Sequence, residues 1–300
     1  MKILINRKPL RDRAWGGGNL FVTALCDTMS SNGHQVVYEF SEDIDVIFMQ
    51  DPRYSDLNIS INEIISYKHF KKDTKVIHRV NECDARKNTT GVDNLLRDSS
   101  GHTDHTVFVS EWMKNYHLKK GWKSDSASVI YNGVNLDHFS KREKIQNGKV
   151  NIVAHHWSNN RLKGFDIYEK IDKFVSDNDD FTFTYIGRHS EQFSNTRVID
   201  PIYGKELGKE LSKYDVYISG SMYDPGPNHI LESLACRIPT YVISKGGGAV
   251  EFAGKSHAYD TFEDLVSILQ SKEYKPNDYI PNTWEHCISE YMNVIDSMEK

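Results

Sequence analysis

Short apolar runs rich in β-branched residues alternate along the chain with stretches of helical length. In the first half the runs are Ile3–Ile5, Val36–Phe40, Val46–Met49, Val76–Val80, Thr106–Val109 and Val129–Tyr131. After the first run, Leu20, Ala24, Leu25 and Met29 recur at helical spacing, and Asn32-Gly33 provides a stop signal. Strands that alternate with helices predict a parallel sheet covered by helices on both faces.

A polar stretch from Asn132 to Lys149 interrupts this rhythm and is typical of a linker. The alternation then resumes, with strands expected at Asn151–His155, Phe181–Ile186, Val216–Ser219 and Thr240–Ile243. Helices are expected at Phe165–Val175, Gly204–Ser212, His229–Cys236 and Thr261–Leu269. The pattern therefore predicts two successive α/β domains, at residues 1–145 and 146–282.

The last segment, residues 283–300, has an amphipathic pattern of its own. One helical face would carry Trp284, Cys287, Ile288, Tyr291, Met292 and Ile295. An apolar stripe of this kind needs a partner surface, so we expect the helix to pack on the body of the protein.

Composition narrows the function classes. The 37 Lys and Arg against 42 Asp and Glu leave a net charge of −5, which argues against broad nucleic-acid binding. No apolar run is long enough to span a membrane, and no signal-peptide core is present, so we expect a soluble cytoplasmic protein. Four scattered cysteines without a CxxC motif indicate neither a disulfide framework nor a zinc ribbon, and no metal is expected.

Ligands of parallel α/β sheets bind beyond the carboxyl ends of the strands, so the loops there are the candidate sites. The first such loop contains Gly16, Gly17 and Gly18 at the start of the first predicted helix. Its backbone can approach a ligand closely, and the helix start favours an anion, which predicts a phosphate or sugar contact. The alternative is a flexible turn. The spacing is not GxGxxG, which weakens a nicotinamide interpretation.

The second candidate is the segment from Asp224 to Glu232. Gly226, Asn228 and His229 lie between the two acids and open a helix whose amides could meet a diphosphate. Carboxylates hold hydroxyl groups well, so acids that flank amides suit a nucleotide-sugar. The alternative is a capping Asp and a surface Glu.

Two further loops carry charge. Arg161 and Lys163 precede the helix at Phe165–Val175, where cations could neutralise a leaving diphosphate. The alternative is a solvated basic turn. His78 begins a polar segment that ends a first-domain strand and continues to Glu82 and Asp84. It is a candidate cleft residue, although a lone histidine is more often structural.

Together these features resemble the family-4 glycosyltransferases of GT-B fold over nearly the whole chain. The most specific part is Asp224–Glu251, with its two acids, the helix and strand entry at Ser233–Pro239 and the glycines Gly246–Gly248. Val129–Val134 looks like the end of that family's first domain. The resemblance implies two Rossmann-like domains facing each other across a cleft, with a C-terminal helix that crosses back to the first domain.

The resemblance also implies residue roles. Glu232 would hold the donor ribose, Asp224 hydroxyls of the transferred sugar, and Lys163 the diphosphate. Gly16–Gly18 would lie near the diphosphate and the acceptor, Gly247 in the next glycine loop at the donor, and His78 at the family's cleft histidine. Two positions depart from the family pattern. Asp replaces Glu at 224, and Ser158 stands where the family has a phosphate-binding Arg, which leaves open whether Arg161 substitutes.

The implied activity is transfer of a sugar from a UDP- or GDP-sugar to a glycan, lipid-linked or other hydroxyl acceptor, with retention and without a metal or other cofactor. Asp43-Ile-Asp45 matches a metal-chelating string only formally, because it precedes a strand instead of ending one. Two alternatives stay open. One is a nucleotide-sugar epimerase of the same fold, and the other is a non-catalytic nucleotide-sugar or glycan binding module.

Peripheral contact with a membrane is a further expectation of the basic segments. These contain Arg7, Lys8, Arg11 and Arg13, and later Lys68, His69, Lys71 and Lys72. Ile64, Ile65, Tyr67 and Phe70 lie near the second group and could meet anionic lipid. The alternative is an ordinary amphipathic helix that packs on the sheet.

Overall fold

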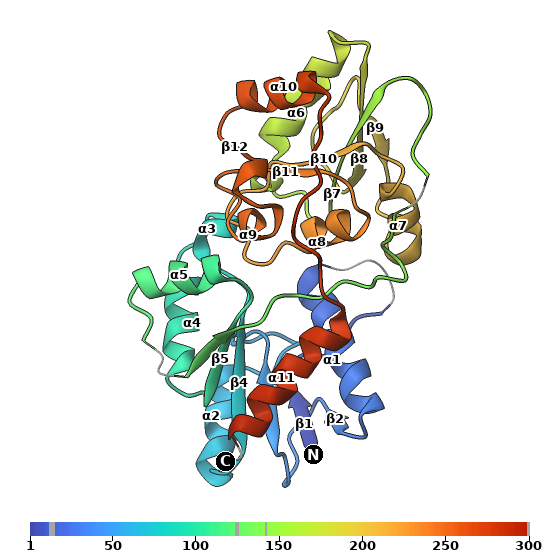
Figure 1. The fold of residues 1–300 in the computed structure, drawn as a ribbon. Coiled ribbons are helices and arrows are strands. Elements are labelled where there is room, and N and C mark those ends of the chain that lie inside the picture. The colour runs from blue at the N-terminus through green and yellow to red at the C-terminus, as the bar shows by residue number, and fades with distance from the viewer. Residues whose placement is uncertain (12–15, 124–125, 142, 299–300) are drawn as a thin grey trace. The chain divides into compact units, whose positions relative to one another are not determined.

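The computed structural model describes residues 1–11, 16–123, 126–141 and 143–298. The chain divides into two compact units, Met1–Gly133 with Trp284–Lys300, and Val134–Thr283. Each unit is an α/β layer structure (Figure 1). The division falls twelve residues before the predicted boundary at 145, because this segment bonds to the second unit. The amide of Val134 donates to the carbonyl of Asn282, and the amide of Ile145 donates to that of Lys213.

Unit 1 is built on a parallel sheet whose strand order, within the described residues, is β2-β1-β3-β4-β5-β6. The strands are β1 (Lys2–Ile5), β2 (Gln35–Val37), β3 (Val46–Met49), β4 (Lys75–Val80), β5 (His105–Phe108) and β6 (Ala127–Val129). The helices are α1 (Gly17–Ser31), α2 (Ile61–Phe70), α3 (Asp84–Lys87), α4 (Val92–Ser100), α5 (Glu111–Lys119) and α11 (Trp284–Met298). Each predicted strand is present, although β2 is shorter than expected and β6 starts two residues earlier.

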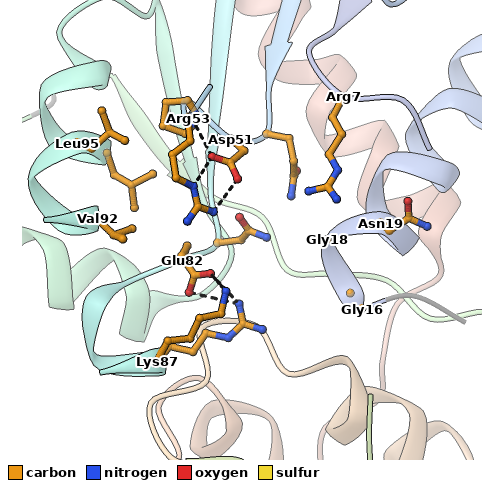
Figure 2. A pocket seen from close by; sticks show the side chains of 16 residues that line it. Arg7, Gly16, Gly18, Asn19, Asp51, Arg53, Glu82, Lys87, Val92 and Leu95 are labelled. Carbon is orange, nitrogen blue, oxygen red and sulfur yellow. Dashed lines mark hydrogen bonds and ion pairs between the residues drawn. The ribbon is translucent and has the colours of Figure 1, made fainter. Parts of the chain in front are cut away.

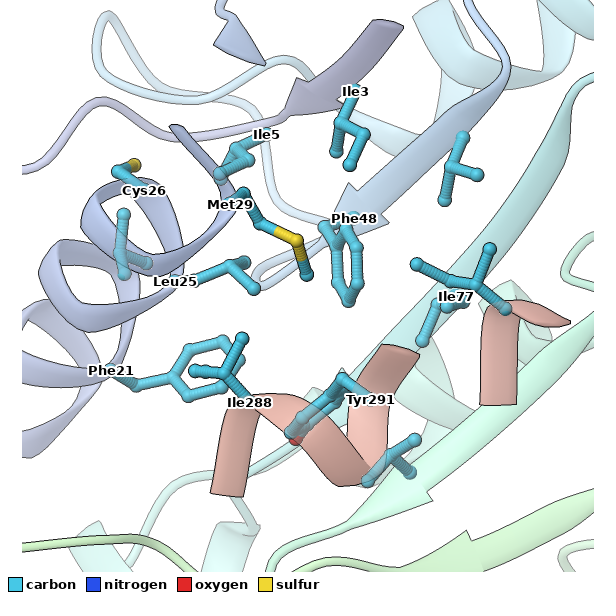
Figure 3. Packing of buried hydrophobic residues seen from close by; sticks show 14 of the residues in the cluster. Ile3, Ile5, Phe21, Leu25, Cys26, Met29, Phe48, Ile77, Ile288 and Tyr291 are labelled. Carbon is cyan, nitrogen blue, oxygen red and sulfur yellow. The ribbon is translucent and has the colours of Figure 1, made fainter. Parts of the chain in front are cut away.

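One core of unit 1 lies between the sheet and helices α1 and α11 (Figure 3). The face of α1 that enters it carries Phe21, Val22, Leu25, Cys26 and Met29. The prediction that Leu20 belongs to the apolar face of this helix was therefore wrong, because Leu20 is 37% exposed. The prediction relied on apolar spacing alone, and two overlapping stripes of α1 satisfy that spacing.

The C-terminal helix α11 contributes to the same core as expected. Cys287, Ile288, Tyr291 and Ile295 are buried in it, and the ring of Tyr291 lies 5.1 Å from that of Phe21. Figure 3 shows Ile288 and Tyr291 facing Phe21 and Phe48. The chain thus returns to unit 1 after completing unit 2, which confirms the predicted crossing.

Unit 2 contains a second parallel sheet with the order β12-β11-β10-β7-β8-β9 in the described residues. The strands are β7 (Val150–His156), β8 (Phe181–Gly187), β9 (Arg197–Ile199), β10 (Val216–Ser219), β11 (Thr240–Ile243) and β12 (Ala258–Tyr259). The helical elements are η1 (Arg161–Lys163), α6 (Phe165–Ser176), α7 (Gly204–Leu211), α8 (Asn228–Ala235), α9 (Ala249–Ala253), η2 (Lys255–His257) and α10 (Phe262–Ser271). The short edge strands β9 and β12 were not predicted. The fold class is otherwise as expected.

The strand orders locate a switch point in each sheet, where the direction of chain winding reverses. In unit 1 it lies between β1 and β3, and in unit 2 between β7 and β10. Successive connections leave such a point toward opposite faces of the sheet, so a crevice opens beyond the strand ends. The loops after these four strands are therefore the places to examine.

The packing of helix α2 distinguishes the two interpretations of its apolar residues, namely contact with a membrane and ordinary packing on the sheet. Ile61 and Ile64 are buried against the sheet in a cluster with Ile47 and Val76. Phe70, at the end of the helix, is 82% exposed. The apolar face of α2 thus packs on the sheet. In the described part of the chain, no helix is long and apolar enough to cross a membrane, and Arg13 lies outside the described residues.

Candidate functional site

The switch point of unit 2 brings two loops into close contact. The amide of Met222, after β10, donates to the carbonyl of Leu162, after β7, at 2.9 Å. Gly164 has φ +103°, and a Cβ there would lie only 2.5 Å from the carbonyl carbon of Gly220. This approach requires glycine and locks the loops together. As a result, Lys163 forms an ion pair with Asp224, whose side chain is 4% exposed.

The backbone around Asp224 is held by the glycine-rich loop after β11. The amide of Asp224 donates to the carbonyl of Gly246, and the amide of Gly248 donates to the carbonyl of Asp224 at 2.8 Å. Gly247 has φ +71°, and a Cβ there would lie 2.7 Å from the Asp224 carbonyl. Tyr223 itself adopts φ +54°. Such a conformation costs a non-glycine residue about 1–3 kcal/mol and is common at functional sites.

Helix α8 presents Glu232 to the same edge of the sheet. Oε2 of Glu232 lies 2.8 Å from Nε2 of His155, at the end of β7. The two side chains are 13% and 8% exposed, so this contact is shielded from water. This pair joins the end of β7 to α8, while Lys163 and Asp224 join the loop after β7 to the loop after β10.

Two more histidines, His229 and His156, lie buried near Asp224. Nε2 of His229 lies 3.0 Å from Oγ of Ser219, and its Nδ1 lies 4.0 Å from Oδ2 of Asp224. The ring of His156 lies 4.5 Å from that of His229. Burial, followed by the nearby cationic groups, lowers the pKa of His156 well below 6.5, so His156 is neutral at pH 7.

Tyr168 holds the ring of His156 in place. Burial raises the pKa of Tyr168, so its hydroxyl keeps its proton. That oxygen accepts from the amide of Gly220 at 3.3 Å and lies 2.6 Å from Nε2 of His156. The hydroxyl of Tyr168 and Nε2 of His156 therefore share one short hydrogen bond that holds the imidazole ring in place. A neutral, hydrogen-bonded layer thus supports the charged groups of the site.

The remaining donor-side predictions fall in different places. Gly226 is half-buried in the loop before α8, and Asn228 is the first residue of that helix. Arg161 adjoins Lys163 in η1, but its guanidinium pairs with Asp166 at 2.5 Å, Glu169 at 2.9 Å and Glu191 at 3.4 Å. The predicted phosphate contact of Arg161 would require it to leave these carboxylates.

A pocket in unit 1 lies at the other switch point (Figure 2). Residues after β1, β3 and β4 line it, and they include the predicted Gly16, Gly17 and Gly18. The charged lining residues are Arg7, Asp51, Arg53, Glu82, Arg86 and Lys87. Arg53 pairs with Asp51 at 2.7 Å, and Lys87 pairs with Glu82 at 2.8 Å. The lining thus contains four cations and two carboxylates, which gives the pocket a positive excess.

His78 does not reach this pocket. It lies within β4, is fully buried and packs 6.1 Å from the ring of Trp122. Burial lowers its pKa to about 3. The prediction made His78 a cleft candidate within the segment that ends this strand, but His78 lies two residues before the end of β4, at Val80. The residues that do emerge at that edge are Asn81 and Glu82.

Several residues of these sites were not predicted as such. Gln50 and Arg53 follow β3 directly, and their place after a buried strand was the available signal. His155 is the last but one residue of β7, and nothing in its sequence context identifies Glu232 as its partner. The two residues lie 77 positions apart in the chain, too far for a local sequence pattern to relate them.

Metal ligation has no obvious place in the described part of the chain. There, no three His, Cys, Asp or Glu side chains gather as a zinc site would require. Asp43 pairs with Lys2 at 2.5 Å, and Asp45 accepts from the Lys2 amide at 2.6 Å. Both acids precede β3, as expected, and so lie at the opposite end of the sheet from the pocket.

No protein-family model matches the chain, and no curated protein matches it significantly in sequence. Solved structures do match it. Sucrose-phosphate synthase from Thermosynechococcus elongatus has a TM-score of 0.67 at 13% identity, over 99% of this chain and 96% of its own. Anabaena Alr3699/HepE, in complex with UDP and glucose, has a TM-score of 0.68 at 12% identity, over 100% and 98%.

WaaG, a glycosyltransferase involved in lipopolysaccharide biosynthesis, has a TM-score of 0.62 at 12% identity, over 99% of this chain and 98% of its own. At such low identities the likeness establishes the fold. The predicted GT-B fold class is therefore confirmed, with a Rossmann-like sheet in each unit.

Proposed function

We propose that this protein is a glycosyltransferase that takes its donor, a nucleotide-sugar, at the switch point of unit 2. The observation that carries the proposal is the convergence of Lys163, Asp224 and Glu232 at the carboxyl edge of one sheet. Two carboxylates beside a lysine and a helix start match a ligand with hydroxyls at both ends and a diphosphate between them. The structural likeness to HepE, solved with UDP and glucose, supports the same class of donor.

The roles follow from the chemistry of each group. Glu232, fixed by His155, accepts from ribose hydroxyls, and Asp224 accepts from hydroxyls of the transferred sugar. The ammonium of Lys163 has three donors, so it can keep Asp224 and also reach the diphosphate. In this proposal the backbone amides of Gly226, Asn228 and His229, just before and at the start of α8, interact with the same diphosphate.

The reaction is a substitution at the anomeric carbon. The bond from this carbon to the diphosphate oxygen breaks, and the bonding pair leaves with the nucleoside diphosphate. The acceptor hydroxyl forms the new bond to the same carbon, and its proton passes to the departing diphosphate oxygen. Negative charge grows on the leaving group, and preorganised cations and amides stabilise it best in a shielded site. Lys163 supplies that charge in this proposal, without a metal ion, and the hexosyl group keeps its anomeric configuration.

The direct test offers UDP- and GDP-linked hexoses, with and without hydroxyl acceptors and with EDTA, and measures nucleoside diphosphate release. We expect release that depends on acceptor and persists in EDTA, and an anomeric configuration in the product equal to that of the donor. Conversion of the donor without an acceptor would identify an epimerase instead. Tight donor binding with no turnover would identify a binding module.

A further inference from the structure

The pocket of unit 1 contains the side-chain amide of Gln50, whose orientation is fixed by the buried Arg79. Oε1 of Gln50 accepts from Nη1 of Arg79 at 3.1 Å. A guanidinium only donates, so the oxygen of Gln50 must face Arg79, and Nε2 must face away from it. A Cβ at Gly18 would lie 3.2 Å from this Nε2 and 3.4 Å from Nδ2 of Asn81. Two N–H₂ groups therefore converge beside the backbone of Gly18 in the pocket.

Arg79 is a buried anchor for this arrangement. It is 2% exposed, its Nη2 donates to Asn132 at 2.7 Å, and its guanidinium lies 4.0 Å from the ring centre of Phe21. No carboxylate of the described residues forms an ion pair with it. Burying a cation without a counter-ion is costly. In return, Arg79 locks the donor face of Gln50 outward and adds positive potential behind the pocket.

Among the described residues, Arg7 is the cation of the pocket lining that has no ion-pair partner. Arg53, Arg86 and Lys87 each pair with a carboxylate of the pocket. Arg7 forms no ion pair with any described residue, and its buried Nε has no hydrogen-bond partner there. Figure 2 shows its guanidinium extended into the pocket on the side of Gly18 and Asn19. Donors without acceptors, around an excess of positive charge, fit an oxyanion.

We propose that this pocket binds an anionic group, a phosphate or a carboxylate, carried by the acceptor. The inference rests on the proposed function. Transfer needs two substrates, and the carboxylates of unit 2 already suit the donor. The switch point of unit 1 has the opposite chemistry: Arg7, Gln50 and Asn81 present donors, and the amides at the start of the 15-residue helix α1 adjoin them. Arg79 is a positioning residue for Gln50.

The experiment compares glucose 6-phosphate, glucuronate and glucose as acceptors for the full-length protein. We expect the two anionic acceptors to have at least a tenfold higher kcat/KM than glucose, and Arg7→Gln to bring that preference close to one. Gln50→Leu should reduce it similarly. Arg11→Gln is the matched control, because Arg11 lies outside the pocket and pairs with Asp27 at 2.6 Å. Equal use of neutral and anionic acceptors would overturn the inference.

Binding measurements show whether the pocket takes an anionic group of the acceptor or the diphosphate of the donor. Calorimetry with UDP should give the same Kd for the wild type and Arg7→Gln. If Arg7→Gln weakens UDP at least tenfold, the pocket serves the donor diphosphate and the acceptor assignment is wrong. Calorimetry with glucose 6-phosphate does not require turnover. If the protein transfers no sugar but binds this probe in an Arg7-dependent way, the proposed function fails while the anion pocket stands.

Discussion

Nε2 of His155 lies 2.8 Å from Oε2 of Glu232, although 77 positions separate the two residues in the chain. Both side chains are largely shielded from water. The contact restrains the carboxylate of Glu232, so the carboxylate is already oriented before any ligand arrives. A preorganised acceptor of this kind loses less entropy on binding than a free surface glutamate would.

Replacing Glu232 tests this preorganisation. Glu232→Ala removes hydrogen bonds between a charged acceptor and ribose, each of which contributes about 1.5–3 kcal/mol. We expect UDP to bind about 10- to 150-fold more weakly, measured by calorimetry. Glu206→Ala, on the exposed face of α7 in the same unit, is the control. His155→Ala should weaken UDP less, and adding it to Glu232→Ala should cause no further loss. Additive losses would show that His155 does not act through Glu232.

The effects of replacing Lys163 and Arg161, two cations of the short helix η1, provide a second test. Lys163→Ala should lower kcat about 10²- to 10³-fold, because it removes a fixed charge from the leaving group. Arg161→Ala should stay within twofold of the wild type, since surface carboxylates already hold Arg161. Comparable losses in both variants would contradict the assignment.

Stability must be separated from catalysis in that comparison, because Lys163→Ala leaves the carboxylate of Asp224 buried without its cation. Breaking such a pair costs about 3–5 kcal/mol. We expect the double variant Lys163→Met with Asp224→Asn to recover much of the lost thermal stability while remaining inactive. Thermal unfolding and diphosphate release on the same samples measure the two effects.

Gly247 and Gly148 form a matched pair of left-handed glycines in unit 2. Their φ angles are +71° and +73°, but a Cβ at Gly148 would meet nothing within 4 Å. Gly148→Ala should therefore cost only the backbone strain, about 1–2 kcal/mol. Gly247→Ala adds a clash with Asp224 and should cost more, with a raised Kd for UDP. Urea unfolding and calorimetry would show this, and equal costs at both positions would argue against a cradle for Asp224.

His78 predicts how stability depends on pH. Burial lowers its pKa from 6.5 to about 3, so the folded state stays neutral where the unfolded state takes up a proton. The contribution of neutral His78 to the free energy of unfolding is present above pH 6.5. It declines by about 1.4 kcal/mol per pH unit as the pH falls toward 3. His78→Leu should flatten this decline between pH 6.5 and 5, by about 2 kcal/mol in urea unfolding. The exposed His69→Gln should follow the wild-type slope, and an unchanged slope in His78→Leu would refute the prediction.

Local patterns determined the elements of this protein and the edge at which ligands should bind. A strand of four apolar residues, such as Val46–Met49, is recognisable because its period and its polar borders lie within one short window. The two acids at 224 and 232 were predicted for a similar reason, since a loop and the first turns of the following helix are also local. Parallel winding then placed both at the carboxyl end of the sheet.

Only the tertiary structure decided which of the candidate side chains act together. Lys163 pairs with Asp224 across 61 positions, while Arg161, two residues before it, turns to the surface. In β4 the alternation sends His78 into one core and Arg79 into the other, where Arg79 orients Gln50. A side chain's partner depends on which distant segment packs beside it, and the burial of the group is set by the same packing. Sequence spacing carries no direct record of either.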